Sequence, residues 1–145
     1  MSTDDISEVW AADAVIDETN LGNEAKKIPQ LHSKYYNMYY REALTVKKLK
    51  YDYKEMEYDK REWFNGDMAE EDLRERGWKP YQKKIMRQDM DKHIQADKDI
   101  IRISLKIDYH TERAKFLEDI VKTIHGRNFI IKSMIDIMKF QAGEY

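Results

Sequence analysis

The sequence predicts an elongated, all-α protein, and three observations lead to this prediction. The first is a line of mostly apolar residues, spaced 4-3-4-3 between Ile28 and Trp63, which marks one side of a long helix. The second is a similar stripe between Ile100 and Ile124, again at helical spacing. The third is the composition of the 145 residues, with 37% charged residues, two Pro and five Gly, which is typical of helices that expose much surface to water. We expect a single helical domain.

Residues 1–20 are expected to form an acidic, partly disordered segment. The first 24 residues contain seven acids and no Lys or Arg, so the formal charge of −2 leaves +5 for the rest of the chain. Val9 and Trp10 are the residues that can anchor the segment. Acidic tails are most often merely solvating; the alternative is that this one contacts a partner or competes with DNA for basic surface.

The long helix is expected over residues 24–64. Thr19-Asn20 can cap its start, and Asn65-Gly66 can end it with a left-handed residue. Gly22 and Pro29 together place the start of a regular register near Ile28. At about 1.5 Å per residue, the stretch from Ile28 to Trp63 is on the order of 55 Å long. This is more than a compact domain of this size needs, which is why we expect an elongated molecule.

A second line of residues, one position further along the same helix, alternates aromatic rings with positive charge. Rings stack on unpaired bases and cations neutralise phosphates, so the pattern suits single-stranded nucleic acid. The alternative, which is the commoner case for such a stripe taken alone, is the margin of a packed face whose cations are solvated or paired, as Arg61 could be with Glu57. The line consists of Tyr36, Tyr40, Leu44, Lys47, Tyr51, Lys54, Tyr58 and Arg61.

Residues 67–95 are expected to be a basic connector. Asp67 is predicted to cap a short helix that Gly77 ends. Between Arg74 and Lys92 the chain has seven basic residues and three acids, the most positive stretch of the sequence. This stretch is either a solvated connector with a short amphipathic helix or a second phosphate-facing surface, and the sequence favours neither.

Residues 97–142 are expected to form C-terminal helices, capped by Asp97. The segment from Ile101 to Ile107 alternates as a strand would, but the stripe to Ile124 is longer than most strands. Gly126 is predicted to break or bend the helix. The last helix is apolar around most of its circumference, so we expect neighbouring copies to bury it. Its candidate oligomerisation residues are Phe129, Ile130, Ile131, Met134, Ile137, Met138 and Phe140.

Catalytic chemistry is not evident in the sequence. No two of the four His residues lie at helical metal-site spacing, and no Gly-rich phosphate loop or nucleophile elbow occurs. We therefore expect no enzyme, no cofactor and no metal. The absence of Cys suits a reducing compartment, and no apolar run approaches the length of a membrane span. The expected location is the cytoplasm.

Three stretches and their order along the chain carry a family resemblance. They are Val15–Leu21, Ala96–Asp99, and Arg127–Lys132 followed by Phe140–Gly143. Together they resemble the UvsY recombination mediator family of T-even-type phages, from about Val15 to the end. The resemblance implies a non-enzymatic factor in the host cell cytoplasm that binds single-stranded DNA and forms a hexameric or heptameric ring. It also implies two partners, because such mediators help a RecA-like recombinase replace the single-strand-binding protein on DNA.

The resemblance also implies functional residues. The family's short basic run before aromatics and a Gly corresponds to Lys60–Gly66, so Lys60 and Arg61 carry over as phosphate contacts, whereas Tyr58 occupies the place of a further basic residue. A ring would repeat a weak patch and so raise the overall affinity. The alternative function is a structural helical assembly protein without nucleic acid. The expected nucleic-acid-binding residues are Lys47, Tyr51, Lys54, Tyr58, Lys60 and Arg61.

Overall fold

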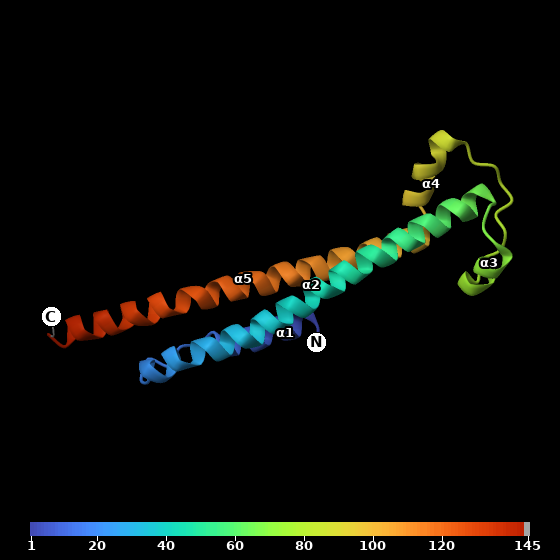
Figure 1. The fold of residues 1–145 in the computed structure, drawn as a ribbon. Helices are drawn as coiled ribbons and strands as arrows, with labels where there is room; N and C mark the ends of the chain where they lie inside the picture. Colours follow the sequence, from blue (N-terminus) through green and yellow to red (C-terminus); the bar gives the residue numbers. More distant parts are fainter. Residues whose placement is uncertain (144–145) are drawn as a thin grey trace. The chain divides into compact units, whose positions relative to one another are not determined.

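The computed structural model describes residues 1–143, and this part of the chain contains helices and no strand. The all-α prediction is confirmed. The chain divides into two compact units: unit 1 combines residues 1–43 with the residues from Thr111 onward, and unit 2 is Leu44–His110. Both long helices therefore contribute to both units. The elements in chain order (Figure 1) are α1 (Thr3–Asp13), α2 (Leu21–Asn65), α3 (Glu70–Arg76), the 3-10 helix η1 (Arg87–Asp89), α4 (Met90–Gln95) and α5 (Lys98–Gln141).

Helix α2 contains the predicted helix and starts earlier than expected. Asn20 caps it, because its Oδ1 accepts a hydrogen bond from the Asn23 N–H at 3.3 Å. Pro29 lies inside the helix, where it lacks an N–H and crowds the preceding turn. The turns before it are stabilised by tertiary contacts, since Leu21 and Glu24 are both buried. The prediction that the register begins near Ile28 is therefore wrong.

The periodicity of both long helices correctly predicts which side faces the interior. Every residue of the 4-3-4-3 line from Ile28 to Trp63 is buried or half-buried, and so is every residue of the α5 stripe from Ile100 to Ile124. The second line of α2 is exposed except for the half-buried Arg61. The aromatic and basic stripe is therefore a surface feature.

The core of unit 1 is formed by α1, α2 and α5. Its buried residues are Ile6, Tyr35, Leu117, Ile120, Val121 and Ile124. A capping box between Ser2 and Asp5 starts α1, and the Trp10 ring packs edge-on against Tyr35 with 5.2 Å between centroids. Val9 and Trp10 thus dock as expected, but the expectation of disorder is wrong for residues 3–13, which form a helix.

Helix α5 is continuous through Gly126, so the predicted break there is wrong. Glycine in a helix interior costs about 1 kcal/mol relative to Ala. This cost is offset by packing on both sides of it, because Ile124, Arg127 and Ile131 are all buried. None of the helices within residues 1–143 has a segment long and apolar enough to cross a membrane.

The core of unit 2 joins the end of α2, the start of α5 and the connector between them. Its buried residues are Phe64, Met90, Ile94 and Ile100. Asp97 caps α5 as predicted, accepting backbone hydrogen bonds from Asp99 at 2.9 Å and Ile100 at 3.2 Å.

The turns around α3 agree with the sequence only in part. Gly66 and Gly77 have positive φ angles of 76° and 73°, so both helix ends are as predicted. Asp67 does not cap α3, whose N-cap is Ala69. Instead, the Asp67 N–H donates to the Glu62 carbonyl at 2.9 Å and closes the end of α2.

Candidate nucleic-acid interface

The six residues predicted to bind nucleic acid all lie on α2 in unit 2, but they differ in solvent exposure. Lys47, Tyr51, Lys54 and Tyr58 are exposed. Lys60 is buried, and Arg61 is half-buried. The first four side chains are open to a DNA strand, Arg61 is partly accessible with 41% of its side chain exposed, and Lys60 is not accessible.

A hollow of about 280 Å³ lies along the first part of this surface. It is lined by Lys47, Lys50, Tyr51 and Lys54, with no acid among them. We call it the lysine hollow. Its residues follow the i, i+3, i+4, i+7 pattern, so they share one helix face. The Lys54 Nζ lies 5.2 Å from the centroid of the Tyr51 ring, a cation–π arrangement.

Sequence reasoning missed Lys50. It lies outside the line that starts at Tyr36, but its i+3 spacing from Lys47 and i−4 spacing from Lys54 could have revealed it. The hollow therefore contains three cations around one exposed ring. This combination can neutralise phosphates and stack on a base.

The surface around Tyr58 has a different electrostatic character. Tyr58 lines a larger hollow of about 690 Å³ with four carboxylates, those of Glu55, Asp59, Asp72 and Glu75, and with the cations of Lys54 and Arg76. Arg76 donates two hydrogen bonds to Asp59 Oδ2, at 2.9 and 2.7 Å. The excess of acids disfavours a phosphate here, although the exposed Tyr58 ring remains able to stack on a base.

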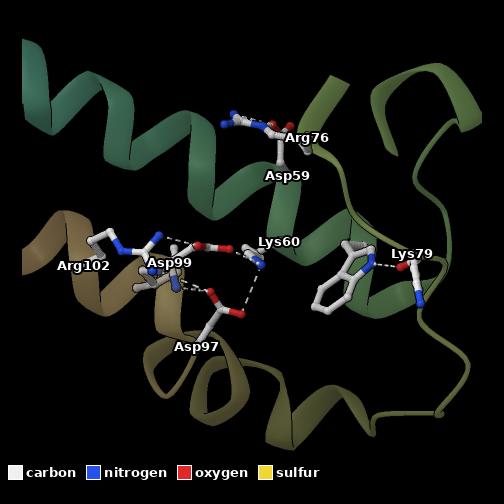
Figure 2. A network of polar contacts seen from close by, with 9 residues as sticks. Asp59, Lys60, Arg76, Lys79, Asp97, Asp99 and Arg102 are labelled. Atoms are coloured by element: carbon white, nitrogen blue, oxygen red, sulfur yellow. Dashed lines mark hydrogen bonds and ion pairs between the residues drawn. The ribbon is translucent and has the colours of Figure 1, made fainter. Parts of the chain in front are cut away.

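Lys60 lies in the interior, which corrects its assignment as a phosphate contact. Its ammonium is 3.2 Å from Asp97 Oδ2 and 2.9 Å from Asp99 Oδ2, with only 4% of the side chain exposed (Figure 2). The ring centroids of Trp63 and Trp78 lie 4.5 and 3.9 Å from the same Nζ. Its charge is balanced inside the protein, so a phosphate would have to displace two carboxylates to reach it.

Arg61 is also engaged within unit 2. Its Nη2 donates to Asp91 Oδ1 at 2.5 Å and to Glu57 Oε1 at 3.1 Å. These hydrogen bonds raise the pKa of the Arg61 guanidinium above its ordinary value. The pairing with Glu57 is the alternative that the helical spacing suggested, and Asp91 adds a second partner that the sequence did not indicate.

The seven candidate oligomerisation residues also fall into groups. Ile131 is buried within unit 1, and Met134 is half-buried. The remaining five side chains leave apolar surface exposed on a single chain, which is unusual for residues of this type. They are Phe129, Ile130, Ile137, Met138 and Phe140.

A comparison with protein families identifies the chain. The model of the family described as "Recombination, repair and ssDNA binding protein UvsY" matches residues 9–144. The chain belongs to the UvsY family. No curated protein sequence matches it.

Solved structures give the same fold for this UvsY-family chain. A crystal structure of the bacteriophage T4 recombination mediator protein UvsY, lattice type II, has a TM-score of 0.84 at 22% identity and covers 98% of each chain. The type IV lattice gives 0.84 at 21% identity over 97% of this chain and 99% of that one, and type I gives 0.81 at 22% identity over 94% and 98%. At this identity the likeness shows the UvsY fold alone.

Proposed function

We propose that the protein is a recombination mediator that binds single-stranded DNA and helps a RecA-like recombinase replace the single-strand-binding protein on it. Membership of a family described by recombination, repair and single-stranded DNA binding supports this role. The observation that carries the proposal is the lysine hollow, in which three exposed lysines surround an exposed tyrosine without an acid among the lining residues.

The binding would combine charge neutralisation with stacking. Each phosphate that a lysine neutralises releases counterions, which gives affinity without sequence preference. Tyr51 is 67% exposed, and a base stacked on such a ring contributes about 1–3 kcal/mol. Neither contribution depends on base identity, as a mediator requires. No nucleotide hydrolysis by the protein is needed for this step.

A single hollow would bind weakly, so we propose that several copies act together. The exposed apolar residues of the last turns of α5 supply a surface through which copies can associate. A hexameric or heptameric ring would repeat the hollow around one strand and multiply its affinity. The strand would then be held ready for the recombinase, with the single-strand-binding protein displaced.

The first experiment measures binding to a labelled oligonucleotide short enough to contact one chain. Fluorescence anisotropy is recorded at several salt concentrations for the wild type, for the triple variant Lys47→Ala, Lys50→Ala, Lys54→Ala, and for a control in which the exposed Lys26, Lys106 and Lys115 become Ala. The slope is that of the logarithm of the binding constant against the logarithm of the salt concentration. Its magnitude is expected to be smaller by roughly 2 in the triple variant, at about 0.7 per phosphate contact. The control is expected to keep the wild-type slope.

A second experiment tests the mediator role itself. Recombinase filaments are assembled on DNA coated with single-strand-binding protein, and the recombinase's DNA-dependent ATP hydrolysis reports loading. The wild-type protein is expected to shorten the lag and the triple variant to leave it unchanged. If the wild type binds no single-stranded DNA at low salt, the DNA role is wrong and the structural assembly function replaces it.

A further inference from the structure

The part of the connector that follows α3, residues 77–97, carries basic residues that form no ion pair with an acid of the described chain. In this subsection "connector" means these residues. Five of its cations are exposed, and within residues 1–143 none of them forms an ion pair with a carboxylate closer than 4.0 Å. In this they differ from Lys60 and Arg61, which are both paired. The five are Lys79, Lys83, Lys84, Arg87 and Lys92.

The first part of this connector is held in place without a helix of its own. Residues 78–86 are not helical, so their position depends on side-chain contacts. The Trp63 Nε1–H donates to the Lys79 carbonyl at 2.6 Å (Figure 2). The Tyr81 ring lies 5.0 Å from both the Trp63 and the Phe64 rings. The backbone that carries the lysines is thereby fixed to the end of α2.

Lys60 joins both ends of the same connector. At the beginning, its ammonium lies 3.9 Å from the centre of the Trp78 ring. At the end, it pairs with Asp97, which also caps α5. Arg61 adds a contact to the middle through Asp91 of α4. Both adjacent basic residues therefore bind the connector, Lys60 from the interior and Arg61 from a half-buried position.

We propose that the connector is a second phosphate-binding surface of unit 2 and that Lys60 positions it without touching DNA. The ligand is the backbone of the same single strand that occupies the lysine hollow, so this inference rests on the proposed function. Trp63 follows Lys54 by nine residues, about 14 Å along α2. Nine residues also turn the helix by about half a circle, so a strand that leaves the hollow passes around α2 to reach the connector, where exposed Lys83, Lys84 and Arg87 can meet its phosphates.

Charge removal from the connector tests its contact with DNA. The variant Lys83→Ala, Lys84→Ala, Arg87→Ala is compared with the wild type by anisotropy on a short and on a longer oligonucleotide. On the longer one, the magnitude of the salt slope is expected to fall by roughly 2, at about 0.7 per contact. Binding of the short oligonucleotide, which the lysine hollow accommodates alone, is expected to persist. The Lys26, Lys106, Lys115 control variant is expected to match the wild type on both.

The role of Lys60 is tested by combining substitutions. Lys60→Met is expected to weaken binding of the longer oligonucleotide by loosening the connector, and to add no further loss in the connector triple variant. A direct phosphate contact would instead add its own loss of about 0.7 in slope. Because Lys60→Met also leaves the Asp97 carboxylate without a cation and Asp99 with Arg102 alone, Trp63→Phe serves as a milder variant. It keeps an aromatic ring at this position but removes the hydrogen bond to Lys79, and it is expected to show the same non-additivity, with faster amide exchange in residues 79–86.

The possible outcomes separate the two proposals. If the wild type binds no single-stranded DNA, the proposed function fails. If it binds and the connector triple variant binds the longer oligonucleotide with an unchanged slope, only the second surface is wrong. Additive losses for both Lys60→Met and Trp63→Phe would overturn the positioning role of Lys60.

Discussion

Arg127 and Glu24, 103 positions apart in the sequence, form an ion pair at 3.2 Å inside unit 1. Their side chains are only 3% and 4% exposed. The other terminal nitrogen of Arg127 donates to the Ala14 carbonyl at 2.9 Å. One guanidinium therefore connects α5 with the first turn of α2 and with the chain that follows α1.

Removing this guanidinium is expected to destabilise unit 1 strongly. Arg127→Met leaves the buried Glu24 carboxylate with only Lys27, 3.3 Å from its Oε1 and half-exposed, as a cationic partner, which is expected to cost up to about 3 kcal/mol. Urea unfolding followed by circular dichroism measures the loss. Lys122→Met, which breaks an exposed pair with Glu118 on the same helix, is the control and is expected to cost less than about 1 kcal/mol. Equal losses for both variants would contradict a special role of the buried pair.

Asp13 is expected to make unit 1 sensitive to acid. Burial raises the pKa of Asp13, but hydrogen bonds from Lys34 at 2.6 Å and Tyr35 at 2.7 Å outweigh burial and hold this pKa below its ordinary value of 3.8. A lowered pKa contributes stability that is present above pH 3.8 and is lost as the pH falls through the folded-state value. In Asp13→Asn, the free energy of unfolding is therefore expected to fall less steeply with decreasing pH below about pH 4 than in the wild type. Urea unfolding at a series of pH values measures this. If the free energy of unfolding falls equally with decreasing pH in the wild type and in Asp13→Asn, Asp13 does not make this contribution.

Two glycines are expected to respond to alanine with opposite signs. Gly126 lies in a helix, and a Cβ added to it meets no atom within 4 Å, so Gly126→Ala is expected to stabilise the protein by about 0.5–1 kcal/mol. Gly66 has a φ of 76°, where Ala is strained, so Gly66→Ala is expected to destabilise by about 1 kcal/mol. Thermal unfolding of the two variants gives both signs in one experiment. A stabilising Gly66→Ala would show that the end of α2 relaxes without strain.

The exposed apolar residues of α5 are expected to mediate association of copies. Ile137 is 56% exposed, and Ile137→Asp places a charge in the proposed contact, where an unpaired charge is unfavourable. Light scattering is expected to show a smaller assembly than for the wild type. Asn128→Asp makes the same change of charge at another exposed position of α5 and is expected to leave the mass unchanged. An unchanged mass for Ile137→Asp would place the assembly surface elsewhere.

Lys60 shows how far sequence reasoning reached at the candidate site. Helical spacing placed it on the apolar line with Met56 and Trp63, whereas the family resemblance assigned it to phosphate. The structure agrees with the spacing, because Lys60 is buried with that line. Its partners could not be predicted, since Asp97 and Asp99 reach it only after the chain has passed through α3, α4 and the connector. Two of the acids around Tyr58 were hidden for the same reason, because Asp72 and Glu75 belong to α3, whereas Glu55 and Asp59 are its neighbours on α2.

The sequence by itself determined the all-α class, the inward and outward sides of the two long helices, the ends at Gly66 and Gly77, and the family. These features depend on local spacing and on the backbone preferences of single residues, which act over one or two helical turns. Only the tertiary structure decided that α2 continues through Pro29, that α5 continues through Gly126, and which cations remain available for DNA. These outcomes depend on burial and on ion pairs between distant segments, whose free energies exceed local preferences and are absent from any short stretch of sequence.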